Sequence, residues 1–374
     1  CDSTKLTSSP EFVGTLMGQG ESVFGTGDIE DLKKALGFDL QAAWMPQRPV
    51  VDWGLGQTRY NRVEGFSTGA QVSMVLGRGY TALGGVRGSW ADRQLNGDLA
   101  LERSNGRSTV RATVYRRLAV ASDFGNPLSF GAGLASLLYA GDEGFYYRSW
   151  GAELSGATPR LGRTEWRLFA EQQWNAPMNT RFTLFRGAQD DRVLPNVIAD
   201  KAVQYGGAVR AQKGWGLDPR GWRVNADLRA EAATGDFDYT RGLLDLTVSH
   251  GLPRGTELAV TASAGGIGGT APAQRAFQLG GLQTVRGIRP GTMSGSAFWM
   301  GRGEFALSRK VVKPVIFGDV GWAGDRRNFS SPGRPMSGVG VGASVLDGMI
   351  RLDVARGLFP QKAVRVDLSI EARF

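Results

Sequence analysis

The sequence has little of what an enzyme or a helical membrane protein needs. Its 374 residues include one cysteine, Cys1, and one histidine, His250. A single cysteine excludes internal disulfides and cysteine metal clusters, and no apolar run approaches the roughly 18 to 20 residues that a membrane-spanning helix requires. The sequence therefore excludes a disulfide scaffold and insertion through apolar helices.

Catalysis has little support from the same residues. His250 is in phase with the aliphatic residues of one alternating row, near the end of an expected strand. This position suits an interfacial side chain and not a general base. No nucleophilic triad, zinc set or calcium loop can be assembled. Asp142-Glu143 and Asp190-Asp191 are most simply solvated loop acids. We predict that the protein is not an enzyme and that it has no catalytic residues, metal or cofactor.

Alternating apolar and charged rows dominate what is present. From Ala363 to Phe374 the charged residues stand between the apolar row Val364, Val366, Leu368, Ile370, Ala372 and Phe374. A period of two fits a strand and not a helix, and the pattern recurs at 222–231 and 257–264. Charged rows opposite uniformly apolar rows suit lipid outside and water inside. We predict an all-β fold, a transmembrane antiparallel β-barrel.

The connections between the expected strands agree with this class. About 16 strands can be placed from residue 50 onward, and an even number is typical of bacterial barrels. Short turns fall on one side, whereas the long segments 122–144, 176–201, 270–296 and 325–335 fall on the other. Outer-membrane barrels alternate short periplasmic turns with long outer loops in this way. We predict a barrel over 50–374, preceded by a periplasmic tether over 1–49 with a short helix at Asp28–Leu36.

The loop at 122–144 carries its own helical signal. Phe130, Leu134, Leu137 and Leu138 recur at helical spacing. They predict a small helix that lies over or into the barrel. A surface cap is the simpler interpretation, and a functional plug is the alternative.

The net charge of +9 does not indicate nucleic acid, because the basic residues are dispersed along the chain. Many arginines fall on the inner rows: Arg111, Arg167, Arg210, Arg223 and Arg351. Guanidinium groups pair well with carboxylates. We therefore expect an arginine-lined interior and no nucleic-acid partner.

The longest loop carries a family resemblance. Its stretch Phe277-Gln278-Leu279-Gly280-Gly281-Leu282-Gln283-Thr284-Val285-Arg286-Gly287 resembles the Val-Arg-Gly loop of the outer-membrane insertase superfamily. This superfamily includes the BamA and TamA barrels and the transporters of two-partner secretion. Phe317-Gly318-Asp319 resembles its Phe-x-Asp strand motif, and the final Phe374 resembles its carboxy-terminal assembly signal. The resemblance extends from about Phe277 to Phe374.

The resemblance implies a specific site. In that family the long outer loop folds back into the lumen, and its arginine meets an acidic residue on a later strand. Here it implies a lumen loop with Val285, Arg286 and Gly287, whose partners are Phe317 and Asp319.

The residues alone give this pairing a physical reason. If Ile316, Val320 and Trp322 face lipid, Asp319 faces inward, where an unpaired carboxylate would be costly. Arg286 can satisfy it through a two-pronged, charge-assisted contact. Glu304 and Asp353 are further inward carboxylates that can share the arginine.

Some features depart from the family. Ile288 follows the Val-Arg-Gly motif where an aromatic is usual, and the 49 residues before the first strand are too few for a polypeptide-transport-associated (POTRA) domain. The stretch 60–65, Tyr-Asn-Arg-Val-Glu-Gly, resembles a motif of surface-antigen barrels attached to other modules. We therefore expect a separate periplasmic or surface subunit to replace the missing domains.

The first residues raise a question of lipidation. Cys1, followed by Asp2, Ser3 and Thr4, resembles the mature start of a bacterial lipoprotein. Cys1 is therefore a candidate for acylation. The alternative is that the sequence simply begins there.

Together these patterns predict a barrel of the bacterial outer membrane, in contact with its lipid and lipopolysaccharide. The resemblance implies insertion or translocation of proteins, or of lipids, with an unfolded client as partner and a weak seam between the first and last strands. The alternative is a passive pore, or a structural barrel that anchors a surface or periplasmic complex.

Overall fold

The structure is a computed structural model, and it describes residues 46–159, 162–185, 194–218, 220–307, 312–345 and 349–370. The predicted tether helix at Asp28–Leu36, the acidic pair at 190–191, Cys1 and Phe374 lie outside the described residues.

Strands make up most of the described chain. They are β1 (Val50–Trp53), β2 (Arg59–Asn61), β3 (Gly65–Gly77), β4 (Tyr80–Ser89), β5 (Leu95–Ser104), β6 (Thr109–Val120), β7 (Tyr146–Thr158), β8 (Arg163–Asn175), β9 (Ala202–Trp215), β10 (Trp222–Gly235), β11 (Tyr239–Leu252), β12 (Thr256–Gly269), β13 (Phe277–Leu279), β14 (Met293–Gly295), β15 (Ala297–Leu307), β16 (Val312–Gly324), β17 (Met336–Val345), β18 (Ile350–Phe359) and β19 (Val364–Ile370). The helical elements are α3 (Phe130–Tyr139) and the single turns η3 (Leu55–Gln57), η5 (Pro253–Gly255), η6 (Ala273–Arg275) and η7 (Arg326–Asn328).

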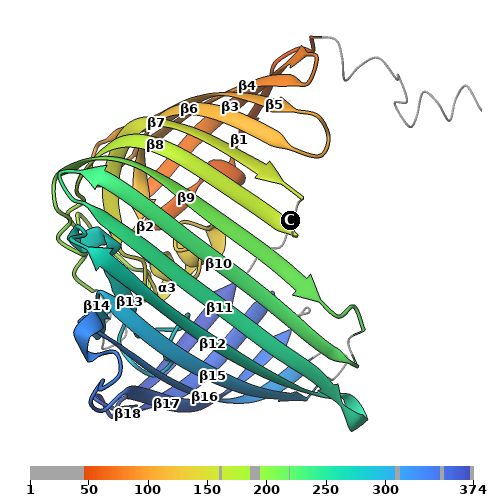
Figure 1. Ribbon diagram of the computed structural model, residues 1–374, viewed down its shortest axis with the longest axis vertical. Coiled ribbons are helices and arrows are strands. Elements are labelled where there is room, and N and C mark those ends of the chain that lie inside the picture. The colour runs from red at the N-terminus through yellow and green to blue at the C-terminus, as the bar shows by residue number, and fades with distance from the viewer. Residues whose placement is uncertain are drawn as a thin grey trace, which may run out of the picture.

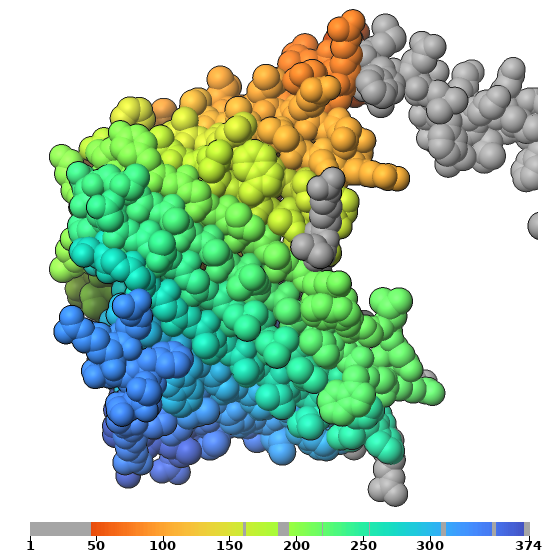
Figure 2. Space-filling model, in the orientation of Figure 1, coloured from red at the N-terminus to blue at the C-terminus, as the bar shows by residue number. Residues whose placement is uncertain are grey.

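One large antiparallel sheet contains 17 of these strands. β1 and β2 both pair with β3, at 70–73 and at 65–67, so they lie end to end at one position of the sheet. The 17 strands therefore occupy 16 positions, which confirms the predicted strand number. From β3 to β19, each strand of this sheet pairs with the next strand of the sheet along the chain, with β12 pairing to β15 across the β13–β14 hairpin. Figure 1 shows these tilted neighbours side by side. The same order gives the colour sequence of the wall in Figure 2.

The two faces of the sheet differ as predicted. One face exposes aliphatic side chains along its whole extent, among them Val72, Leu99, Val114, Leu168, Leu228, Val260, Ile316 and Val354. A contiguous exposed apolar surface of this size suits lipid and not water.

The opposite face carries ion pairs. Arg111 contacts Glu102 at 2.8 Å, and Arg210 contacts Asp227 at 2.6 Å. Arg167, Arg223 and Arg351 are paired with carboxylates in the same way. The arginine-lined interior predicted from the sequence is therefore present.

Trp322 was expected to face lipid with Ile316, on the same row of β16. Its side chain is instead buried, with only 5% exposed. Its ring packs at 6.3 Å from Phe329 of the following loop, which covers it.

The helix predicted in the loop at 122–144 is confirmed as α3. Ser129 caps its amino end by accepting a hydrogen bond from the Ala132 amide at 3.2 Å, and Ala140 ends it in the left-handed region with φ 61°. The expected position as a surface cap is wrong. α3 lies against β2 and β19, the two strands at the edges of the sheet, and buries Gly133, Ala135 and Ser136.

Candidate functional site

The connection between β12 and β15 folds back onto the inner face of the sheet. Its strands β13 and β14 pair with each other, and β13 and β14 both lie against β16. The loop buries its apolar side chains in a cluster with the wall: Phe277, Leu279, Val285, Ile288, Phe298, Met300 and Met336. Because these groups leave water together, the loop is held inside the barrel by apolar burial as well as by charge.

Arg286 stands at the tip of this loop and is 0% exposed. Its Nε and Nη2 donate to the two carboxylate oxygens of Asp319, each at 2.6 Å. Its backbone amide donates to Asp319 Oδ2 at 3.0 Å. A two-pronged contact of this kind fixes both direction and distance. The structure thus brings together the two residues that the sequence paired.

The other predicted partners surround the same guanidinium group. Nη1 of Arg286 donates to Glu304 Oε1 and lies 3.8 Å from Asp353 Oδ2. The centre of the guanidinium group stands 3.6 Å from the centre of the Phe317 ring, a cation–π distance. One buried arginine therefore joins β15, β16 and β18.

Two further arginines complete the charge balance, and the sequence did not place them in the site. Arg351 bridges Glu304 at 3.0 Å and Asp353 at 2.9 Å. Arg302 lies 3.6 Å from Asp319 and donates to the Gln283 carbonyl at 2.9 Å. Their inward phase on the strands was visible in the sequence, but the lateral distance between strands was not. Three cations therefore face three carboxylates, so each buried charge is compensated.

The backbone at position 287 has a conformation and surroundings that only glycine fits. Gly287 has φ 79°, a conformation that side chains disfavour. A Cβ placed there would also lie 2.7 Å from the Arg356 carbonyl carbon and the Gly357 nitrogen of β18. The loop tip thus approaches the wall at backbone contact, and only glycine leaves room. Ile288, which follows it, is 0% exposed. Its aliphatic side chain stands where the family motif usually has an aromatic one.

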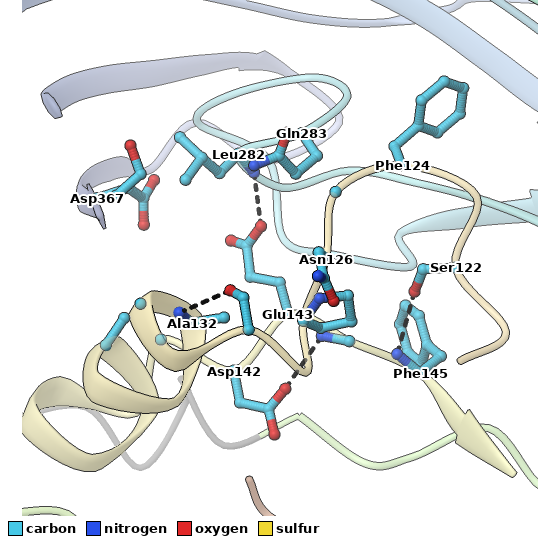
Figure 3. A pocket seen from close by; sticks show the side chains of 18 of the residues that line it. Ser122, Phe124, Asn126, Ala132, Asp142, Glu143, Phe145, Leu282, Gln283 and Asp367 are labelled. Atoms are coloured by element: carbon cyan, nitrogen blue, oxygen red, sulfur yellow. Dashed lines mark hydrogen bonds between the residues drawn. The ribbon is translucent and has the colours of Figure 1, made fainter. Parts of the chain in front are cut away.

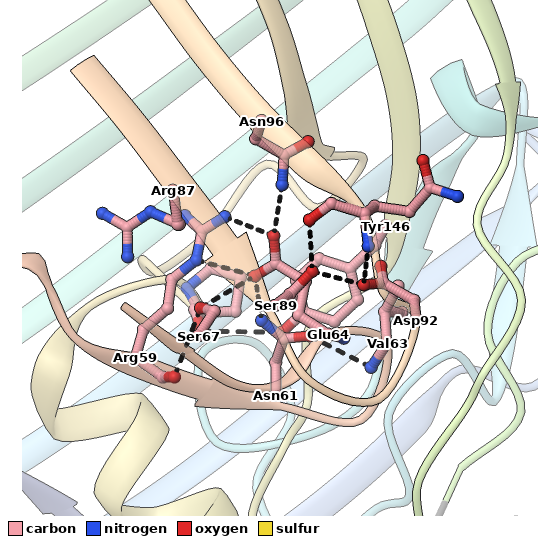
Figure 4. Close-up of polar contacts among 12 residues, drawn as sticks. Arg59, Asn61, Val63, Glu64, Ser67, Arg87, Ser89, Asp92, Asn96 and Tyr146 are labelled. Carbon is pink, nitrogen blue, oxygen red and sulfur yellow. Dashed lines mark hydrogen bonds and ion pairs between the residues drawn. The ribbon is translucent and has the colours of Figure 1, made fainter. Parts of the chain in front are cut away.

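A second buried polar cluster lies at the β2–β3 hairpin, in the stretch 60–65 (Figure 4). Glu64 is 0% exposed and accepts two hydrogen bonds from Arg59, both at 2.8 Å. Asn61 and Asn96 donate to the same carboxylate at 2.8 and 2.9 Å. These contacts fix the hairpin to β5. The motif therefore builds a rigid first edge of the sheet.

The acidic pair Asp142 and Glu143 was predicted to be solvated, but both side chains have partners within the protein. Asp142 is 7% exposed, forms an ion pair with Arg62 at 3.2 Å, and accepts a bond from the Arg62 amide at 2.9 Å. Glu143 accepts from the Leu282 amide at 2.7 Å and contacts Arg365 at 3.3 Å. Both acids therefore link the loop after α3 to other parts of the fold.

Other chemistry is not supported within the described residues. His250 stacks on Trp222 with ring centres 4.4 Å apart, at the end of β11. Across the described ranges, no group of three histidine, cysteine, aspartate or glutamate side chains is placed to hold a metal. No helix among those residues is long and apolar enough to cross a membrane.

Comparison with known proteins identifies the fold. No family model matches the sequence, and no curated protein matches it. Among solved structures, BamA from Haemophilus ducreyi lacking POTRA domains 1–3 superimposes with a TM-score of 0.56 and 12% identity, over 86% of this chain and 70% of that one. CdiB from Acinetobacter baumannii gives a TM-score of 0.46 and 16% identity, over 86% of this chain and 58% of that chain. CdiB from Escherichia coli gives a TM-score of 0.46 and 13% identity, over 87% and 62%. The likeness to BamA shows that the sheet has the fold of a BamA-type barrel.

Proposed function

We propose that this barrel inserts or translocates proteins, or lipids, at the bacterial outer membrane. The exposed aliphatic face indicates a lipid environment, and the shared fold indicates the outer membrane. The partners that we propose are an unfolded client polypeptide, further subunits of a complex, and the surrounding lipid and lipopolysaccharide.

The observation that supports this function most is the contrast between two regions of the wall. Around Arg286, one guanidinium group braces β15, β16 and β18 from inside. Among the described residues, no pairing register joins β19 back to β2. An unpaired strand edge presents backbone donors and acceptors that can template another strand. A stiff wall beside an unpaired edge suits a protein that accepts client strands at that edge.

Reconstitution tests this proposal. Purified barrel in liposomes should accelerate folding of a small urea-denatured outer-membrane barrel by at least about tenfold over liposomes alone, scored by protease resistance and gel mobility. A matched amount of an unrelated porin is the control, because it perturbs the bilayer equally. Equal rates in the three samples would contradict the proposal.

The pore or anchor alternative makes a different prediction. The lumen loop and its apolar cluster occupy the inner face of the sheet, so we expect only small or brief conductance steps in planar bilayers. A large steady conductance without client folding would favour a passive pore. Acylation of Cys1 and a signal role for Phe374 stay predictions, which intact-mass measurement and removal of Phe374 would test.

A further inference from the structure

The two edges of the sheet are bridged by a helix. α3 lies against both β2 and β19. A Cβ added at Gly133 would lie 2.9 Å from the Tyr60 nitrogen and 3.2 Å from its oxygen, so α3 packs directly on the backbone of β2. The far side of α3 contacts the last strand. The helix therefore occupies the seam where a further strand pairing would otherwise stand.

One side chain of α3 engages the backbone of β19. The Tyr139 hydroxyl donates to the Leu368 carbonyl and accepts from the Leu368 amide at 3.2 Å. In an antiparallel strand the N–H and C=O of one residue point to the same edge. Because the hydroxyl bonds to both, it takes the position that a neighbouring strand would take beside Leu368. Covering an edge with a helix is a common protection against unwanted strand addition.

The loop after α3 adds a second contact to the same strand. Glu143 joins Arg365 of β19 to the Leu282 amide of the lumen loop, and Arg365 lies 3.7 Å from Asp367. Figure 3 shows the Glu143 carboxylate directed at the Leu282 amide, with Asp367 nearby. Beside these residues is a cavity of about 480 Å³, lined by residues of α3 and of the segments 122–127, 141–145, 278–284 and 367–369. α3 therefore has open space next to it into which it can move.

We propose that α3 is a displaceable plug at the seam, with Tyr139 standing in for an extended client strand at the edge of β19. The inference rests on the proposed function and names its partner as a terminal β-strand. Displacing α3 exposes the Leu368 amide and carbonyl, and the incoming strand replaces the two hydrogen bonds that Tyr139 gives up. The plug thereby keeps the edge closed until a strand competes for it.

The test compares Tyr139→Phe with the wild type in detergent. The probe is a fluorescent synthetic peptide with the sequence of residues 364–370, which form strand β19 of this barrel. Tyr139→Phe removes both hydrogen bonds and keeps the ring. It should bind the peptide at least about fivefold more tightly and speed hydrogen exchange at the Leu368 amide at least about tenfold.

Two further variants separate the plug from general loosening. Tyr205→Phe, at an exposed tyrosine on β9, is the matched control and should behave as the wild type. Gly133→Ala forces α3 away from β2 and should also increase peptide binding, which covers the case in which Tyr139→Phe does not fold. Heat-modifiable gel mobility reports folding of each variant. Unchanged peptide binding in folded Tyr139→Phe and Gly133→Ala, with or without faster exchange, would overturn the plug.

The outcome is separable from the proposed function. Peptide binding that rises in Tyr139→Phe, in a barrel that folds no client in liposomes, would support the plug and contradict the insertase proposal. Client folding by the wild type with no effect of either α3 variant would do the reverse.

Discussion

Arg286 and Asp319 share three hydrogen bonds, two from the guanidinium group at 2.6 Å and one from the backbone amide at 3.0 Å. The carboxylate therefore fixes both the side chain and the main chain of the loop tip. Asp319 is 4% exposed, so loss of the arginine would leave a buried carboxylate without its closest cation. The stability of the lumen loop depends on this pair.

Replacing Arg286 with alanine should destabilise the barrel by about 3–5 kcal/mol, the usual cost of breaking a buried ion pair from one side. Urea titration followed by tryptophan fluorescence and gel mobility would measure the change. Arg286→Lys should recover only part of the loss, because an ammonium cannot make the two-pronged contact.

Arg210→Ala is the matched control for that variant. Arg210 also binds one carboxylate, Asp227, through two nitrogens, but its side chain is 39% exposed. Solvent screening should limit its effect to about 1 kcal/mol or less. Equal losses from the two arginine variants would show that Arg286 has no special place in the structure.

Gly287→Ala should destabilise the loop by more than Gly106→Ala. The two glycines have nearly the same φ, 79° and 81°, so the conformational cost of about 1–2 kcal/mol is common to both. Only at Gly287 would the new Cβ meet backbone atoms, since nothing lies within 4 Å at Gly106. Thermal unfolding of both variants isolates the close approach to β18, and identical melting shifts would refute it.

Glu64→Gln should destabilise the β2–β3 hairpin by about 2–3 kcal/mol, because the fully buried carboxylate neutralises Arg59. Glu165→Gln is the control, since Glu165 is paired with Arg163 at a side chain that is 34% exposed. Hydrogen exchange over residues 59–67 should rise in the first variant and stay unchanged in the second. No change in the first would mean that the buried cluster does not hold this edge.

Glu143 should make stability depend on pH. Burial, with the nearby Asp367 and Asp142, raises the pKa of Glu143 to about 7, against the opposing effect of Arg365 and of the Leu282 amide. Because this pKa is above the unfolded value near 4.5, the folded state holds the extra proton and stability falls as the pH rises from 4.5 to 7.

The effect of pH on stability should be moderate, because 20% of the Glu143 side chain is exposed to solvent. We expect a loss of about 1–2 kcal/mol over that range. Glu143→Gln should remove this part of the pH slope, measured as the free energy of unfolding at pH 5 and pH 8. The same slope in wild type and variant would contradict the raised pKa.

The period of two and the alternation of connection lengths were enough to predict the fold and the strand number. Both depend on local sequence, because most strands of the large sheet pair with the strand next to them along the chain. The pairing of Arg286 with Asp319 followed from the motif and from the inward phase of residue 319. The positions of Arg302 and Arg351 in the network depend on lateral distance across the sheet, which residue spacing does not give.

Contacts between distant segments were not predictable. The helical spacing in 122–144 indicated α3 but not its place against β2 and β19. Tyr139 and Leu368 are separated by 229 residues, and nothing in either local sequence marks the contact. Asp142 and Glu143 looked solvated because loop acids usually are, whereas their partners, Arg62 and Arg365, come from opposite ends of the barrel sequence.

Client folding in liposomes, measured side by side for wild type, Arg286→Ala and Arg210→Ala, tests the central claim most directly. If the lumen loop braces an insertase, Arg286→Ala should lose at least about tenfold in client folding rate at equal amounts of folded barrel, and Arg210→Ala should keep the wild-type rate. Full activity of folded Arg286→Ala, or no acceleration by the wild type, would contradict the account.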